Sequence, residues 1–294
     1  MNHSQVKIIS AAAAAAILGG AVCAPAQNLN GTVNTGFYGS AAAVQTVNTG
    51  FGNAAGGNDS VGGSELDAAY GRVSGGNLYL FLAGNFENNG NHLNIFIAGG
   101  GAGQSTLAAP ATGTMQAMNG SKFSPGFLAT FALDINNFSG TWYSEEYNLI
   151  AATGGFVGGL PQTSTGIAAG SDGGLSSLYI NNNHASTMGA PGTALSGATS
   201  GLNALTGMEL VIPLSAIGYT GGNINVLADI NGGGDGFLSN QFLPGLPVGS
   251  GNVGSSGKFD FSGAPGQFFP VTVPEPSALA LLGAGALLAV RRRK

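Results

Sequence analysis

Three aromatic side chains that stand close together in the sequence are the strongest candidates for contact with a sugar. The segment TWYSEEY contains Trp142, Tyr143 and Tyr147, and Trp142 is the only tryptophan of the 294-residue chain. Aromatic side chains combine a broad apolar face with a polar group, which suits them to stacking on sugar rings. The same residues are also common in protein cores, so burial of Trp142 in the interior is the alternative.

Acidic side chains provide two candidate calcium sites. The segment DINGGGDG places Asp229, Asn231 and Asp235 in a glycine-rich loop, although it lacks the regular acid spacing and the bidentate Glu of an EF-hand. Glu65 and Asp67 are two residues apart and therefore share one face of a strand. They could bind calcium together with loop carbonyls, or lie at a solvated strand edge. Calcium is the one cofactor that the sequence suggests.

The sequence contains few side chains that could take part in catalysis. His92 and His184 lie in polar turns, where a metal pair is conceivable and solvated surface residues are the simpler interpretation, and no HExxH or GxSxG motif is present. Glu145 and Glu146 are adjacent, so in a strand they point to opposite faces and cannot flank one glycosidic bond. We therefore expect no catalytic residues. A glycan-active enzyme is the alternative, and it requires two carboxylates from distant strands.

Charge excludes a nucleic-acid partner. Only 7% of the residues are charged, and all 13 acidic residues follow residue 26. Between residues 27 and 275 the basic side chains are Arg72, Lys122 and Lys258, which leaves a formal charge of −10. Three cations cannot build the basic patch that a nucleic-acid backbone requires.

The strands that must position these residues are short and numerous. The run 78–82 is apolar and flanked by glycines, and the segment HLNIFIA alternates in the way expected of a strand. With 65–74 these runs predict a three-stranded meander, and PLSAIGY predicts one helical turn from Pro213 to Gly218. Long Gly/Ser/Thr segments, GFVGGLPQTSTGIAAGSDGG among them, read as loops. Further strands are expected at 43–49, 127–133, 141–150, 208–212, 224–230, 258–261 and 267–273. This pattern predicts an all-β fold, an antiparallel jelly-roll-like β-sandwich in one domain.

The N-terminal end has the features of a secretory signal peptide. A weakly basic start is followed by an apolar stretch and by Ala24-Pro25-Ala26, which fits the small-x-small cleavage rule. We predict cleavage between Ala26 and Gln27. The single cysteine, Cys23, makes lipoprotein processing the alternative, although the residues before it do not fit such a site.

The C-terminal end predicts a short transmembrane helix. Residues 277–290 are uncharged and are followed by Arg291, Arg292, Arg293 and Lys294, four of the eight basic side chains. A positive cluster after an apolar segment stops a chain at the cytoplasmic face of a membrane. As a helix the segment would be about 21 Å long, which is short for a permanent span and suits transient anchoring. An amphipathic or core helix is the alternative.

This tail resembles the PEP-CTERM sorting signal of bacterial proteins. The resemblance lies in three elements in order, namely Pro274-Glu275-Pro276, a short Ala/Leu/Gly helix and the arginine cluster Arg291, Arg292 and Arg293. It implies that an exosortase, a membrane-embedded cysteine protease-transpeptidase, cuts near Pro-Glu-Pro while the chain is held at the inner membrane. The expected organisation is a signal peptide at 1–26, a glycine-rich β-sandwich at 27–272 and a sorting and anchor segment at 273–294.

The body of the chain is similar to DOMON-like and family-9 carbohydrate-binding sandwiches. Segments such as AVQTVNTGFGN, MELVIPLSAIGY and FLSNQFLPGLP carry this resemblance. It implies a jelly-roll-like fold and ligand binding. Such families bind sugars with stacked aromatics or haem with Met and His.

Together these observations predict an exported protein of the cell surface or extracellular matrix that is not an enzyme. We expect it to act in adhesion or structure, with an extracellular polysaccharide as its partner. Ice binding is a further alternative, and it would need a flat array of threonines or similar residues.

Overall fold

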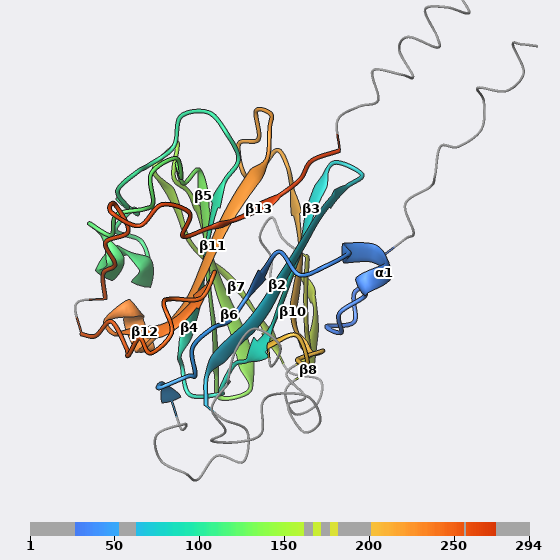
Figure 1. Cartoon of the computed structure of the whole chain (residues 1–294), viewed down its shortest axis with the longest axis horizontal. Coiled ribbons are helices and arrows are strands. Elements are labelled where there is room, and N and C mark those ends of the chain that lie inside the picture. The colour runs from blue at the N-terminus through green and yellow to red at the C-terminus, as the bar shows by residue number, and fades with distance from the viewer. Residues whose placement is uncertain are drawn as a thin grey trace, which may run out of the picture. The chain divides into compact units, whose positions relative to one another are not determined.

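The computed structural model describes residues 27–52, 63–161, 167–171, 177–181, 201–255 and 257–274 (Figure 1). Residues 26–273 form one compact unit. The predicted signal peptide, its alanines Ala24 and Ala26, and the tail from Glu275 onward lie outside the described residues, so the two terminal helices stay predictions.

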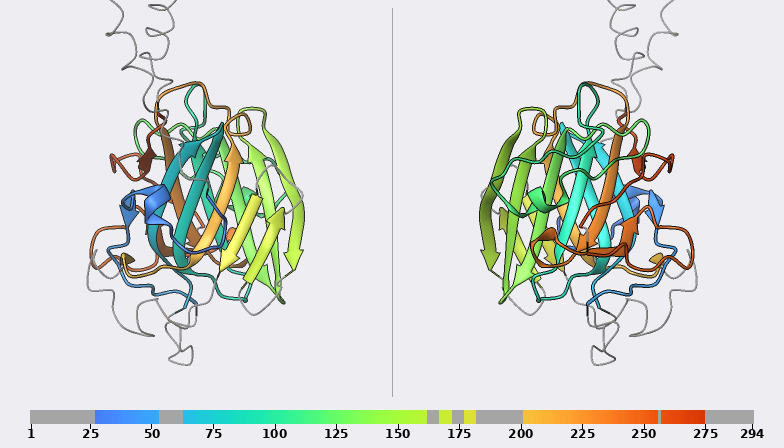
Figure 2. Two further views of the ribbon diagram at one scale, coloured as in Figure 1. Left: turned by 90° about the vertical axis from the view of Figure 1, so that its right-hand side faces the viewer. Right: turned by 90° about the vertical axis from the view of Figure 1, so that its left-hand side faces the viewer.

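The body is all-β and consists of two antiparallel sheets (Figure 2). The first sheet has the order β1-β2-β3-β10-β9-β8, and the second has the order β12-β11-β4-β5-β6-β7, with β13 paired to β11. The strands are β1 (Ala43–Val44), β2 (Glu65–Ser74), β3 (Asn77–Asn85), β4 (His92–Ala98), β5 (Phe131–Phe138), β6 (Thr141–Asn148), β7 (Thr153–Pro161), β8 (Ile167–Ser171), β9 (Ser177–Asn181), β10 (Gly207–Pro213), β11 (Ile224–Asn231), β12 (Leu238–Leu243) and β13 (Phe269–Val271). The short helices are α1 (Thr35–Tyr38), η2 (Thr114–Met118) and η3 (Gly233–Asp235).

The predicted meander is wrong in one respect. β2 and β3 form the expected antiparallel pair, but β4 belongs to the other sheet, where it lies between β11 and β5. β3 instead pairs with β10. The chain between β3 and β4 therefore crosses from one sheet to the other, because both strands bury an apolar face against the same core.

That core lies between the two sheets and closes the sandwich. Alternate residues of β3 and β4 contribute Leu80, Leu82, Ile95 and Ile97, all fully buried, to one hydrophobic cluster. In Figure 2 the first sheet faces the viewer on the left and the second sheet on the right. The two antiparallel sheets are confirmed; the jelly-roll connectivity stays a prediction.

The glycine-rich segment at 153–161 is a strand rather than the expected loop. β7 pairs with β6 along its whole length. A Cβ atom on Gly154 would lie 2.1 Å from the carbonyl oxygen of Glu146, so this close approach requires glycine. Because its glycines have no side chains, the strand does not show the alternation of apolar and polar residues by which a strand is recognised, and its sequence resembles a loop.

The N-terminal segment of the body is fastened to the first sheet by Glu209 of β10. This fully buried carboxylate accepts hydrogen bonds from the Tyr38 hydroxyl (2.7 Å), from the backbone N–H groups of Asn30 and Gly31, and from the Gln27 side chain. Burial and the neighbouring Glu209 raise the pKa of Tyr38. Gln27, the predicted first residue of the exported chain, thus contacts the body directly.

Candidate functional site

The outer face of the second sheet carries a band of polar side chains. The strand registers align these residues in two rows across β11, β4, β5 and β6. Side chains two residues apart share a face, so both rows point the same way. One row is Asp229, Asn94, Asp134 and Glu145, and the other is Asn231, His92, Asn136 and Tyr143.

Long loops cover the remainder of that face, and the polar band itself is largely buried, with Asp229, Asn94 and Asn231 fully enclosed. Towards the other end of the strands the face is apolar, with Phe96, Ala132 and Leu227 in a cluster that includes Met115 and Met118 of η2. Beside this covered part lies a pocket of about 540 Å³. Its lining residues are Asn89, Gly90, His92, Thr114, Asp134, Asn136, Phe138, Tyr143, Glu145, Phe156, Gly233 and Gly234.

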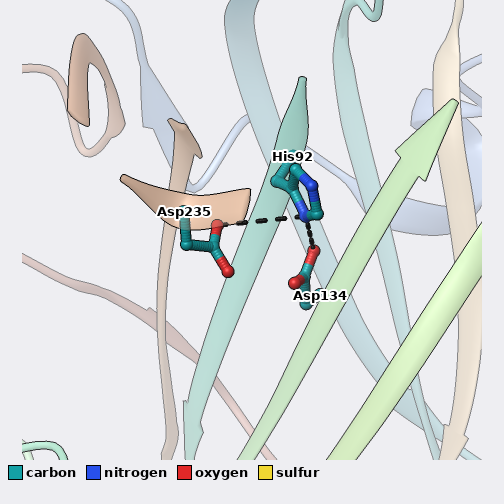
Figure 3. Close-up of side chains that lie close together, drawn as sticks. All are labelled: His92, Asp134 and Asp235. Atoms are coloured by element: carbon teal, nitrogen blue, oxygen red, sulfur yellow. Dashed lines mark hydrogen bonds and ion pairs between the residues drawn. The ribbon is translucent and has the colours of Figure 1, made fainter. Parts of the chain in front are cut away.

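His92 and Asp134 line the pocket and form what we call its floor. Figure 3 shows these two side chains beside Asp235. The His92 Nδ1 atom lies 2.6 Å from Asp134 Oδ1 and 3.9 Å from Asp235 Oδ1. The backbone N–H of Gly234 donates to His92 Nε2 at 3.2 Å. Because Nε2 accepts a hydrogen bond, the proton of a neutral ring resides on Nδ1, where it is donated to Asp134.

Behind His92, two further carboxylates are completely buried. Asp229 and Asp235 both accept hydrogen bonds from Asn94 Nδ2, at 3.5 and 3.0 Å. Desolvation raises the pKa of each of these carboxyl groups well above its usual value, and the charge of nearby Asp134 raises it further.

Glu145 holds η2 against the sheet at the side of the pocket. Its Oε2 atom accepts from the Thr114 N–H (3.0 Å), from the Thr114 hydroxyl (3.2 Å) and from the Tyr147 hydroxyl. The same Thr114 hydroxyl contacts Asp134 Oδ2. A Cβ atom on Gly113 would lie 2.0 Å from the Tyr147 hydroxyl oxygen, so glycine is required where the chain enters η2. Burial and Glu145 together raise the pKa of Tyr147.

An aromatic wall faces this polar floor. Phe138, Tyr143 and Phe156 are 55%, 36% and 63% exposed, which is unusual for side chains of this size. They extend from three neighbouring strands, β5, β6 and β7, and the rings of Tyr143 and Phe156 are 6.4 Å apart. The wall therefore presents apolar ring faces next to hydrogen-bonding groups.

Of the three aromatics expected to contact a glycan, the structure places only Tyr143 in the pocket. Trp142 points to the opposite face of β6, where it is 1% exposed and its ring meets that of Phe86 at 6.2 Å. Tyr147 shares the face of Tyr143 but lies under η2, where it is fully buried and its hydroxyl donates to Glu145. Trp142 and Tyr147 are thus structural residues, because strand alternation and the η2 cover remove them from the surface.

Of the three candidate calcium ligands in the glycine-rich loop, the structure brings two together and gives the third another role. Asp229 and Asp235 do come together, and they are joined by Asp134, His92 and Asn94 from other strands. Asn231 instead braces the loop, since its Nδ2 donates to the Asp235 carbonyl and its Oδ1 accepts from the Gly232 N–H.

The remaining candidates fall elsewhere. Glu65 and Asp67 lie in β2 and are buried, so they do not form a solvated strand edge. Glu146 is buried on the face of β6 opposite Glu145, as expected. His92 is 6% exposed and belongs to the floor of the pocket rather than to a polar turn, while His184 lies outside the described residues.

The residues that the sequence missed are Asn94, Asp134, Asn136, Thr114, Phe138 and Phe156. Their signal is alternation: HLNIFIA puts His92 and Asn94 on one face, and DINNF does the same for Asp134, Asn136 and Phe138. What the sequence does not contain is the register that aligns those two strands.

The comparisons with known proteins concern the tail. Residues 272–294 match the PEP-CTERM protein-sorting motif. Comparison of the chain with curated proteins and with solved structures gives no match. Within the described residues, none of the helices has the length and apolar character needed to span a membrane. The sorting motif indicates that the chain is an exported, membrane-associated surface protein that is processed by an exosortase.

Proposed function

We propose that this exported protein binds a polysaccharide in the pocket described above and so acts in adhesion or in the extracellular matrix. The observation that carries the proposal is the exposed wall of Phe138, Tyr143 and Phe156 beside a polar floor. Sugar rings have apolar faces and a hydroxyl periphery, so a ring stacked on the wall would direct its hydroxyls to the floor.

The charge of the pocket favours a particular class of sugar. Asp134 and Glu145 line it, and Asp235 lies directly behind His92. The body as a whole carries many more acidic than basic side chains. Uronic-acid or sulfated polysaccharides would be repelled, so neutral or amino sugars fit best. Asn89 and Asn136 supply uncharged donors and acceptors for their hydroxyls.

Removal of two of the three rings of the aromatic wall tests the proposal. The double change Tyr143→Ala and Phe156→Ala is expected to weaken binding of a neutral glucan or chitin oligosaccharide by about 10- to 100-fold, because each stacked ring contributes about 1 kcal/mol or more. Isothermal titration calorimetry measures the loss. Val248→Ala is the matched control, since Val248 is an exposed apolar residue that does not line this pocket. Binding that is equal in the double variant and the control would contradict the proposal.

A glycan-active enzyme is the second candidate, because one observation favours it. Asp134 and Glu145 both contact the hydroxyl of Thr114, which brings two carboxylates together within the pocket. Retaining glycosidases use a pair about 5 Å apart. Against catalysis, Asp134 is 2% exposed, and its two oxygens contact His92 and Thr114 rather than the open part of the pocket.

Measurement of new reducing ends separates the two functions. The binding proposal predicts that none appear when the protein is incubated with a polysaccharide that it binds. An enzyme would release them, and Glu145→Gln would abolish the release while Val248→Ala would not.

A further inference from the structure

Three buried carboxylates meet beneath the pocket, and their one basic neighbour among the described residues is His92. Asp134, Asp229 and Asp235 are 2%, 0% and 0% exposed, and they come from β5, β11 and η3. Their hydrogen-bond partners are His92, Thr114 and Asn94, and the Asp134 and Asp235 carboxyl groups also contact each other. Several acidic groups in a medium of low dielectric repel one another unless a cation lies among them.

The basic side chains of the body lie elsewhere. Between residues 27 and 273 the sequence contains only Arg72, Lys122 and Lys258. Arg72 lies over the Phe37 ring, and Lys122 forms an ion pair with Asp260 at 2.9 Å. Lys258 lies beside Gly120. A Lys or Arg from within the body therefore does not neutralise the three carboxylates.

Unpartnered oxygen atoms mark the same place. Asp229 Oδ2 and Asp235 Oδ2 are buried and have no hydrogen-bond partner. The amide oxygen of Asn94, Oδ1, is also buried and has no hydrogen-bond partner. A buried polar atom without a partner costs about 1–3 kcal/mol, so these three oxygen atoms are available as ligands at one place.

Asn94 links these observations. Its amide nitrogen donates to Asp235 Oδ1 and to Asp229 Oδ1, so the Asn94 side chain bridges the two carboxylates. The oxygen and nitrogen of an amide exchange places by rotation of the group. With a cation among the carboxylates, that rotation would turn Asn94 Oδ1 into a further ligand.

We propose that Asp134, Asp229 and Asp235, with the amide oxygen of Asn94, bind one calcium ion beneath the pocket. Carboxylate and amide oxygens are the ligands that calcium prefers. His92 holds Asp134 through Nδ1 and is fixed by the Gly234 N–H at Nε2, so it orients a ligand from behind. The ion reaches the site through the pocket, whose lining includes Gly233 and Gly234 next to Asp235. It would join β4, β5 and β11 to the 231–235 loop.

Metal titration of the purified protein tests this assignment. After treatment with a chelator, addition of Ca²⁺ is expected to raise the melting temperature by about 5–10 °C at 100 times Kd, with one ion bound per chain by calorimetry. Zn²⁺ and Mg²⁺ are added in parallel. Absence of a Ca²⁺ shift would overturn the proposal, and a shift with Zn²⁺ but not with Ca²⁺ would overturn its oxygen ligands.

Two variants make the test specific. Asp229→Asn is expected to abolish the Ca²⁺ shift, yet to be at least as stable as the natural protein in chelator, because it removes a buried charge. Asp260→Asn is the matched control, since Asp260 is an exposed carboxylate paired with Lys122. A full Ca²⁺ shift in Asp229→Asn would contradict the site. The measurement uses no sugar, so its outcome is independent of polysaccharide binding.

Discussion

Trp142→Ala is expected to lower the free energy of unfolding by about 3–5 kcal/mol, the usual cost of removing a large buried aromatic side chain. The ring is 1% exposed and lies in the core between the sheets, against Phe86. Denaturant unfolding followed by circular dichroism measures the change. Because Trp142 faces away from the pocket, the folded fraction of the variant should bind sugar as before.

Trp142→Phe and Tyr143→Ala serve as controls for that experiment. The indole N–H of Trp142 is buried without a hydrogen-bond partner, so phenylalanine keeps most of the packing and loses no hydrogen bond. Trp142→Phe should therefore recover most of the stability. Tyr143→Ala should cost little, because its side chain is 36% exposed. A stable Trp142→Ala protein that no longer binds sugar would contradict the placement of Trp142 in the core.

Glu65→Gln and Asp67→Asn are each expected to stabilise the protein at alkaline pH by a few kcal/mol. Burial raises the pKa of Asp67 to about 7, and burial together with the charge of Asp67 raises the pKa of Glu65 to about 9. Both oxygen atoms of the Asp67 carboxylate lack a hydrogen-bond partner, as does Glu65 Oε1. Ionisation of this pair is therefore unfavourable in the folded state.

The direction of the pH dependence follows from proton binding. The unfolded chain releases these protons near pH 4, whereas the folded protein holds them until about pH 7 and about pH 9. The folded state thus binds more protons at these two groups across this window, so their contribution to stability is greatest below pH 4 and falls as the pH rises. The free energy of unfolding, measured at pH 5, 7 and 9, should decrease less with pH in each variant than in the natural protein. Identical slopes would refute the assignment.

The sequence predicted the sandwich because its main strands carry short apolar runs, some continuous and some alternating. β2, β3, β4, β10 and β11 all contain such runs. β12 was missed because Ser239, Asn240 and Gln241 are consecutive polar residues, yet all three are buried and hydrogen-bonded. Such a strand has no hydrophobic period, and only its neighbours make it a strand.

The site was only partly predictable for a related reason. The 229–235 loop and Tyr143 stand out locally, but their partners are brought to them by strand pairing. Asp134 and Glu145 are opposite one another, as are Asn94 and Asp229, through registers that no local pattern specifies. The side of β6 to which Trp142 and Tyr143 point was equally open, since alternation shows only that adjacent residues face opposite ways.

Chemical-shift mapping with an oligosaccharide shows where on the protein the sugar binds. A neutral glucan or chitin oligosaccharide is titrated into isotopically labelled protein, and the backbone amide signals are followed. We expect the largest changes at 134–145, at Phe156 and at 233–234, which surround the pocket. Changes confined to another surface, such as the smaller pocket around Lys122 and Phe127, would contradict it.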